Sequence, residues 1–184
     1  MTMITRFLMG PSRPGIEALR PVLYRIAYAW CHDPALADDL VQETQTKAWI
    51  RRAQLRETAA LKAWMVTIMH HCWLDYLRGS RDFDDIDAWQ DTLESAEQNP
   101  EVCCDRKQVI TCVRAAVARL PRGQRQVLTL VDLEEFGYAE VAGILDIPVG
   151  TVMSRLSRAR AALKTMLDTA AQQTAVSPVL RRVK

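Results

Sequence analysis

The sequence lacks the features that would place the chain in a membrane or outside the cell. None of its apolar runs approaches the ~18 residues needed to cross a bilayer. The first residues lack both the apolar length and the cleavage-site pattern of a signal peptide. The five cysteines are odd in number and follow no regular spacing, which is typical of a reducing compartment. We therefore expect a cytoplasmic protein with no direct membrane insertion.

The usual signatures of an enzyme are also missing. The sequence has no glycine-rich phosphate loop, and Cys103 and Cys104 are adjacent rather than spaced as zinc ligands. Cysteine and histidine are sequence neighbours at residues 31–32 and 70–72. Neighbouring side chains on a helix point in different directions, so neither run pairs a nucleophile with a base. We expect no catalytic residues, no metal and no cofactor.

Positive charge is absent from one stretch of the chain. Residues 82–105 contain nine acidic side chains and no lysine or arginine, whereas residues 1–81 carry a net charge of +4 and residues 106–184 a net charge of +7. The overall net charge of +2 therefore hides two basic blocks separated by an acidic one. This composition predicts a flexible linker over residues 82–105.

Apolar residues recur at helical spacing on both sides of this linker, and strand-like alternation is absent. The pattern predicts an all-α fold of two small helical domains joined by the flexible acidic linker. The first domain is expected at residues 1–81 and the second, which contains a helix-turn-helix, at residues 106–171. A polar tail is expected at residues 172–184.

Residues 138–160 read as two short helices joined by a tight turn, with Pro148 suited to the first turn of the second helix. The buried stripe of that helix is expected to consist of Val152, Leu156, Ala159 and Leu163. Its opposite face and flanks carry Met153, Ser154, Arg155, Ser157, Arg158 and Arg160. Short polar and arginine side chains opposite a buried stripe suit entry into a DNA major groove. An ordinary amphipathic hairpin with a solvated basic face is the alternative.

An acidic face is expected on the helix that runs from residue 34 to about residue 50. It consists of Asp38, Asp39, Gln42 and Glu43. Asp39 and Glu43 are like charges four residues apart, which disfavours an isolated helix. Glu43 also lies beyond the reach of the helix N-terminal dipole. This face is either solvated or a binding site for a basic partner.

A longer helix is expected from residue 59 to residue 78, after a basic connection that contains Arg51, Arg52 and Arg56. One of its faces carries Thr67, His71, Asp75 and Arg78, and Trp64, Trp73 and Tyr76 also lie on this helix. Aromatic rings beside cations suit single-stranded nucleic acid, because unstacked bases find π-faces and phosphates find positive charge. The alternative is that the aromatic residues belong to the core, and for Trp64 this is the preferred interpretation.

Three sets of segments, in this order, carry a family resemblance. Residues 38–44 (DDLVQET) and 47–49 (KAW) come first, residues 61–68 (LKAWMVTI) and 74–78 (LDYLR) second, and residues 120–128, 137–142 and 148–160 third. Together they resemble the bacterial RNA polymerase sigma factors of the extracytoplasmic-function (ECF) group. In that family the first set binds the largest polymerase subunit, the second melts and reads the −10 element, and the third binds the −35 element.

The resemblance implies a transcription initiation factor that binds core RNA polymerase and directs it to −10 and −35 promoter elements. The polymerase-binding residues would be Asp38, Asp39, Gln42 and Glu43. The −10 residues would be Arg51, Arg52, Arg56, Thr67, His71, Asp75 and Arg78. The −35 residues would be Tyr138, Thr151, Met153, Ser154, Arg155, Ser157, Arg158 and Arg160.

The implied partners are core RNA polymerase, promoter DNA and an anti-sigma factor, membrane-anchored with a cytoplasmic segment, that holds the protein inactive. Three positions depart from the family pattern, and the first is Gln45, which replaces the apolar residue usual after the Gln-Glu-Thr run. Met153 stands where many relatives carry arginine and offers a base only apolar contact, and His71 stands where relatives often have a small polar or amide side chain. A stand-alone helix-turn-helix regulator that does not bind polymerase is the alternative, but it leaves the first domain without a role.

Overall fold

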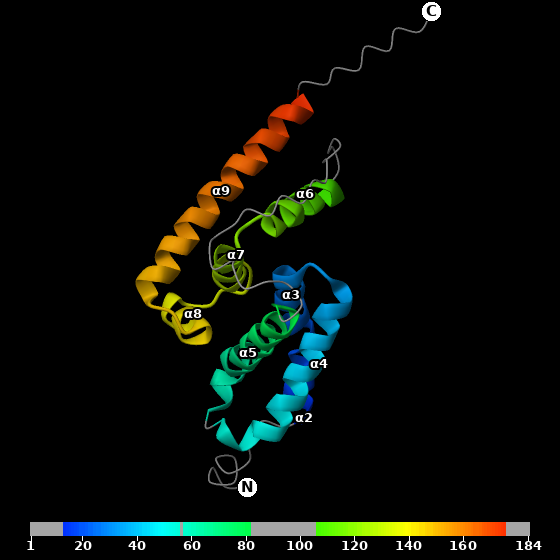
Figure 1. Cartoon of the computed structure of the whole chain (residues 1–184), viewed down its shortest axis with the longest axis vertical. Coiled ribbons are helices and arrows are strands. Elements are labelled where there is room, and N and C mark those ends of the chain that lie inside the picture. Colours follow the sequence, from blue (N-terminus) through cyan, green and yellow to red (C-terminus); the bar gives the residue numbers. More distant parts are fainter. Residues whose placement is uncertain (1–12, 56, 82–105, 176–184) are drawn as a thin grey trace, which may run out of the picture.

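Helices make up the regular structure of the computed structural model, which describes residues 13–55, 57–81 and 106–175 (Figure 1). The first domain contains α2 (Arg13–Ala18), α3 (Arg20–Cys31), α4 (Pro34–Arg51), two short 3₁₀ turns, η1 (Arg52–Gln54) and η2 (Thr58–Ala60), and α5 (Leu61–Arg81). The second contains α6 (Arg106–Ala118), α7 (Arg122–Leu128), the π-helical turn η3 (Thr129–Leu133), α8 (Tyr138–Leu145) and α9 (Val149–Ala175). These ranges contain no strand, and the predicted all-α fold is confirmed.

Local sequence signals set the helix ends in the first domain. His32 adopts a left-handed backbone conformation (φ 56°) and ends α3. The carboxylate of Asp33 then accepts hydrogen bonds from the backbone N–H groups of Ala35 and Leu36, at 2.8 and 3.2 Å, and Pro34 occupies the first turn of α4. An aspartate N-cap satisfies N–H groups that have no partner inside the helix. The predicted boundary between the two helices is confirmed.

The core of the first domain lies where α3, α4 and α5 pack together (Figure 1). Trp30 from α3, Leu40 from α4 and Met65 from α5 are all buried. Leu36 and Leu61, which were also expected in the core stripes, are only half-buried. On α4 the buried stripe instead includes Ala37, whose small side chain allows the neighbouring helix to approach closely.

The second domain departs from a regular helix at one point. The apolar spacing of Val127, Leu130 and Val131 predicts a single helix over residues 124–134, but α7 ends at Leu128 and the chain continues as the π-helical turn η3. The backbone N–H of Glu134 donates to the carbonyl of Thr129 at 3.1 Å, and Glu135 then takes a left-handed conformation (φ 60°). The wider turn brings Leu130, Glu134 and Phe136 into the interior, where all three are buried.

The helix-turn-helix consists of α8, the turn at residues 146–148, and α9. Asp146 is left-handed (φ 52°), and the next backbone N–H, that of Ile147, donates to the carbonyl of Ala142 at 3.1 Å. On α9 the predicted buried residues Val152, Leu156 and Ala159 are buried, and Leu163 is half-buried. Helix α9 runs on to Ala175, so the first four residues of the tail expected at residues 172–184 are helical.

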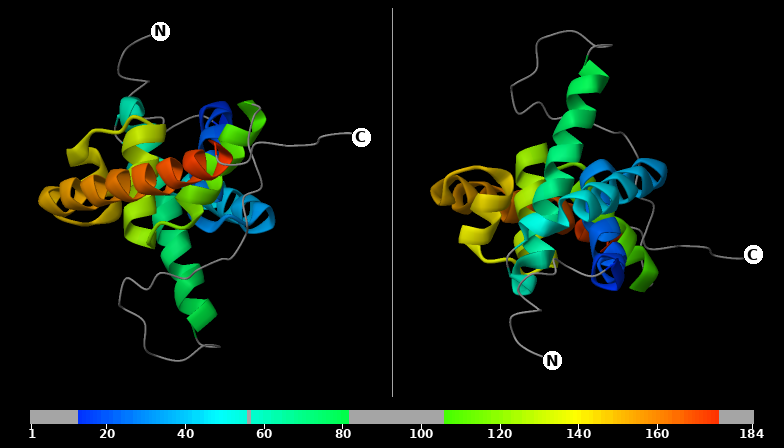
Figure 2. Two further views of the ribbon diagram at one scale, coloured as in Figure 1. Left: turned by 90° about the horizontal axis from the view of Figure 1, so that it is seen from above. Right: turned by 90° about the horizontal axis from the view of Figure 1, so that it is seen from below.

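The two domains pack directly against each other. Helix α5 lies against α8, and α3 contacts α6, α7 and η3 (Figures 1 and 2). Buried apolar residues from both domains form one continuous cluster. The expected linker at residues 82–105 and the end of the tail lie outside the described residues, so the flexible linker stays a prediction. No helix in the described part is both long and apolar enough to span a bilayer.

Candidate nucleic-acid interface

The face of α9 opposite its buried stripe is open to solvent. Met153, Ser154, Ser157 and Arg158 are all exposed, as the helical pattern predicts. Ser154 Oγ donates to the carbonyl of Thr151 at 3.1 Å, and Arg158 Nη2 donates to Ser154 Oγ at 3.4 Å. An exposed arginine beside two serine hydroxyls provides donors for phosphate oxygens or base edges. Thr151, at the front of the helix, is half-buried.

The two flanking arginines of α9 already have partners within the domain. Arg160 donates from Nε and Nη2 to the two carboxylate oxygens of Asp132 on η3, at 3.1 and 2.6 Å. Hydrogen bonding and the negative charge of Asp132 raise the Arg160 pKa above its ordinary value. The guanidinium of Arg155 covers Gly123 so closely that a Cβ atom there would lie 2.9 Å from Arg155 Cζ. Arg155 and Arg160 therefore also brace α9 against α7 and η3.

Tyr138 opens α8 beside this face and is 40% exposed. The helix begins at Gly137, whose backbone N–H donates to the Glu140 carboxylate at 2.9 Å. This bond satisfies an N–H group at the start of α8, where no intrahelical partner exists. Tyr138 is thereby held at a capped helix end next to α9, with its ring available to a ligand.

The candidate −10 residues come from two elements of the first domain. His71, Asp75 and Arg78 are exposed on α5, and Arg78 pairs with Asp75 at 2.9 Å. Thr67 is half-buried and donates its hydroxyl to the carbonyl of Ala63 at 3.0 Å. The hydroxyl hydrogen of Thr67 is therefore engaged inside the helix, while its oxygen keeps acceptor capacity.

The basic connection before α5 supplies the remaining candidate −10 residues. Arg51 and Arg52 are exposed at the end of α4, and the Arg52 guanidinium lies 4.3 Å from the centre of the Trp49 ring. Trp49 is itself 41% exposed, so a cation and an aromatic surface face solvent together. Arg56 lies outside the described residues. The aromatic residue Trp64, expected in the core, is half-buried against it.

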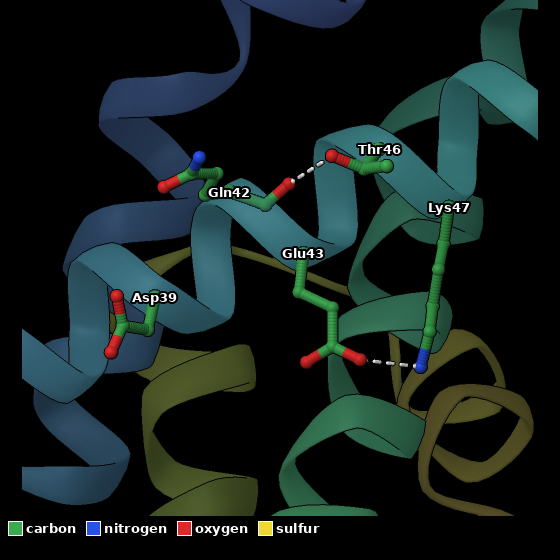
Figure 3. A pocket seen from close by; sticks show the side chains of 5 residues that line it. All are labelled: Asp39, Gln42, Glu43, Thr46 and Lys47. Carbon is green, nitrogen blue, oxygen red and sulfur yellow. Dashed lines mark hydrogen bonds and ion pairs between the residues drawn. The ribbon is translucent and has the colours of Figure 1, made fainter.

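Three residues of the acidic face of α4, Asp39, Gln42 and Glu43, line a shallow surface hollow together with Thr46 and Lys47 (Figure 3). Asp39 and Gln42 make no side-chain hydrogen bond or ion pair within the described part of the chain, whereas Asp38 pairs with Arg20 at 2.9 Å. The expectation that the Asp39–Glu43 repulsion lacks compensation inside the helix is wrong. Lys47 Nζ lies 2.7 Å from Glu43 Oε1, and it also approaches Asp75 on α5 at 3.8 Å.

A group of polar contacts between the two domains could not be predicted from the sequence. Arg125 on α7 donates to the carbonyl of Trp30 at 2.9 Å, and Gln126 Nε2 lies 3.4 Å from His70 Nδ1. The buried carboxylate of Glu134 contacts Arg25 and Lys62. These residues lie far from their partners in sequence, so helical periodicity offers no signal that would pair them.

Burial sets the protonation of the histidines and thiols near this boundary. Burial, together with the neighbouring His71, lowers the pKa of His70 to about 4. Burial beside Arg125 likewise lowers the pKa of His32 to about 4. Burial raises the pKa of the Cys31 and Cys72 thiols. Both histidines are therefore neutral at pH 7 and both thiols are protonated, so these groups have neither charge nor nucleophilic character to offer a ligand.

An exposed serine and arginine face on a helix-turn-helix, next to a helical domain with exposed basic residues, defines a two-domain helical DNA-binding protein. The sequence matches the Sigma-70 region 2 family over residues 16–83 and the Sigma-70, region 4 family over residues 110–163. It is 33% identical over 163 residues to the ECF RNA polymerase sigma factor EcfG of Rhodopseudomonas palustris, and the aligned region covers 87% of each chain. The chain belongs to the ECF RNA polymerase sigma factors.

Further comparisons agree with this assignment. The ECF RNA polymerase sigma factor SigM of Bacillus subtilis is 30% identical over 148 residues, covering 79% of this chain and 88% of SigM. Among solved structures, the sigma factor RpoE of Bartonella quintana, crystallised with the anti-sigma factor NepR, is similar with a TM-score of 0.67 and 26% identity. That similarity covers 84% of this chain and 95% of RpoE. The protein is thus a transcription initiation factor.

Proposed function

We propose that the chain binds core RNA polymerase through the acidic face of α4 and presents α5 and α9 to the −10 and −35 elements of a promoter. The observation that carries the proposal is the state of Asp39 and Gln42, which lie exposed in the hollow of Figure 3 without a partner in the described part of the chain. An exposed carboxylate with no intramolecular partner is free to pair with a basic protein surface.

At the −35 element, Arg158, Ser154 and Ser157 would make polar contacts from one exposed face of α9. Met153 is 54% exposed and has no hydrogen-bond donor, so it would contact an apolar base edge such as a thymine methyl group. Base readout at that step is then weaker than an arginine–guanine contact, and DNA shape would supply part of the specificity. Arg155 and Arg160 would reach phosphates from their braced positions.

At the −10 element, His71 and Asp75 would read a base that has left the stack. Both are exposed on α5, and the end of α4 adds Arg51 and Arg52 for the phosphates. A base extruded from duplex DNA costs a few kcal/mol to unstack, so such a pocket acts on a strand that polymerase has begun to open. The ring of Trp49, covered by Arg52, offers a nearby stacking surface.

We also propose that an anti-sigma factor holds the protein inactive in the cytoplasm. Support comes from the RpoE relative, which was crystallised with the anti-sigma factor NepR. A membrane-anchored anti-sigma factor with a cytoplasmic segment would bind the exposed acidic face of α4 and so compete with polymerase. Purified chain should then form a complex with that segment that excludes core polymerase.

Core-polymerase binding by charge-reversed variants tests this function. Asp39→Arg should lower affinity for core polymerase by at least tenfold, because it replaces an attractive contact with a repulsive one. Asp168→Arg is the matched control, since Asp168 is exposed on α9 and away from the acidic face. Both variants should keep the helical content and melting temperature of the parent chain. Equal affinity of Asp39→Arg and Asp168→Arg for core polymerase would show that the acidic face of α4 is not the polymerase-binding site.

A further inference from the structure

A single buried carboxylate joins the two domains. The side chain of Glu134 is only 4% exposed, and it lies between two cations of the first domain. Arg25 donates from Nε to Oε1 at 3.0 Å and from Nη2 to Oε2 at 3.3 Å. We propose that Glu134 is an interdomain latch, which holds the free chain in a closed arrangement that must open before the chain spans a promoter.

Lys62 holds the same segment at three points. Its Nζ lies 3.2 Å from Glu134 Oε2, donates to the backbone carbonyl of Glu134 at 2.9 Å, and sits 4.6 Å from the centre of the Phe136 ring. Charge-assisted hydrogen bonds in a partly desolvated site are stronger than those between neutral groups. A carboxylate buried to this extent is stable only while its partners stay in place.

The other polar groups at the boundary are unevenly satisfied. Arg125 Nη1 donates to the carbonyl of Trp30 at 2.9 Å, but Trp30 Nε1 and Arg125 Nε are buried without a hydrogen-bond partner among the described residues, and Gln126 approaches His70 only to 3.4 Å. A group without a partner gains hydrogen bonds with water when the domains separate, which lowers the cost of opening. Within the described residues, the interdomain ion pairs are those of Glu134, which favour the closed arrangement.

The closed arrangement is too short for a promoter, and this step rests on the proposed function. The −10 and −35 elements lie about 25 base pairs apart, or about 85 Å at 3.4 Å per base pair. His71 lies ten residues from either end of α5, Arg158 lies nine residues from the start of α9, and α8 between the two helices has eight residues. At 1.5 Å per residue the two DNA-facing residues are therefore separated by at most about 40 Å along these helices. In the structure α5 packs against α8, which directly precedes α9 (Figure 1).

The latch can limit promoter binding by the free chain although the DNA-facing surfaces of α5 and α9 are not covered. His71 on α5 and Arg158 on α9 are both exposed in the closed arrangement, so either face can meet DNA alone. What the latch prevents is simultaneous contact with both elements. Because two linked contacts bind far more tightly than either one, loss of simultaneous binding is enough to keep promoter affinity low.

Scattering and DNA binding by Glu134→Gln test the latch. This change keeps the shape of the side chain and removes its charge, and Glu135→Gln makes the same change at the adjacent exposed residue, which has no ion pair in the described part of the chain. By small-angle X-ray scattering, the full-length Glu134→Gln chain should show a larger radius of gyration than the parent and Glu135→Gln chains. The ratio of open to closed molecules should rise at least about tenfold.

A second variant distinguishes separation of the two domains from simple unfolding of one domain. Lys62→Met removes the same ion pair from the first domain and should expand the chain similarly, with little further expansion in the double variant. Helical content by circular dichroism should be unchanged in all variants. An unchanged radius of gyration in both single variants would overturn the latch. If both variants expand but Asp39→Arg binds core polymerase as tightly as the parent chain, the latch stands and the proposed polymerase-binding face is wrong.

Discussion

The charges at the domain boundary and those on the DNA-facing side of α9 occupy opposite environments. Glu134 is buried between two cations, whereas Arg158 is exposed and makes one long hydrogen bond to a serine. A buried charge requires fixed partners and so determines geometry, while an exposed arginine keeps its hydration and stays free for a new ligand. The molecule thus uses buried charge to arrange its domains and exposed charge to bind.

The largest expected effect comes from the buried side of α9. Leu156 is 3% exposed, and Leu156→Ala should lower the free energy of unfolding by about 2–5 kcal/mol through lost burial and the cavity left behind. Urea denaturation followed by circular dichroism measures this change. Ser157→Ala is the control on the exposed side, and a loss as large as that of Leu156→Ala would contradict the assignment of the two faces.

The exposed side of the same helix should respond in binding rather than in stability. Arg158→Ala should weaken promoter binding by the polymerase complex, and if the contact is to phosphate it should reduce the salt slope by about 0.9. Equilibrium titrations at several salt concentrations measure both quantities. Lys164→Ala is a matched loss of charge further along α9. Unchanged affinity of Arg158→Ala across these salt concentrations would show that this face does not contact DNA.

This contrast also explains how much of the molecule could be predicted from its sequence. The all-α fold, the helix boundary at Asp33 and Pro34, and the buried stripe of α9 follow from short-range signals, since apolar spacing and capping act within one helix. For the same reason the exposure of Met153, Ser154, Ser157 and Arg158 was predictable. The roles of these side chains in DNA and polymerase binding stay predictions.

The domain boundary could not be predicted in this way. Glu134 is the first of two adjacent glutamates near the end of an expected helix, which is typical of a solvated surface. The π-helical turn changes its direction, and its partners Arg25 and Lys62 are 109 and 72 residues away. The same holds for the Arg160–Asp132 pair, which crosses from α9 to η3. Such contacts depend on tertiary packing and produce no periodic pattern in the sequence.

Acidification should weaken the packing around His70, with a moderate effect. This ring faces Trp30 of α3 and Gln126 of α7, and its charged or titratable neighbours are His71 and Asp146. Its pKa of about 4 in the folded chain lies below the ordinary value near 6.5, so protonation favours the unfolded or opened form. The stabilisation is fully present above about pH 6.5 and is lost as the pH falls toward 4.

The size of this pH effect can be isolated with one substitution. At pH 5.5 the loss from His70 should be on the order of 1 kcal/mol relative to pH 7.5. His32, which has a similar pKa, adds a loss of the same sign in both proteins. His70→Gln cannot titrate, so the unfolding free energy of this variant should fall less between the two pH values. Identical losses in the parent and His70→Gln chains would rule out His70 as a source of the effect.

The smallest expected effect concerns the backbone next to the latch. Glu135 has a left-handed conformation (φ 60°), which is unfavourable for a residue with a side chain and natural for glycine. Glu135→Gly should therefore raise the free energy of unfolding by about 0.5–1 kcal/mol, as measured by urea denaturation. Glu135→Ala keeps the Cβ atom and should give no such gain. A gain of equal size in both variants would point to loss of charge rather than relief of strain.

Footprinting of a −10/−35 promoter with and without core polymerase tests the central claim most directly. We expect the free chain to leave at least one of the two elements unprotected, and the chain with core polymerase to protect both. The Asp39→Arg chain should fail to protect both elements even when core polymerase is present. Protection of a −35 site alone, equally strong with and without core polymerase and unaffected by Asp39→Arg, would contradict the claim.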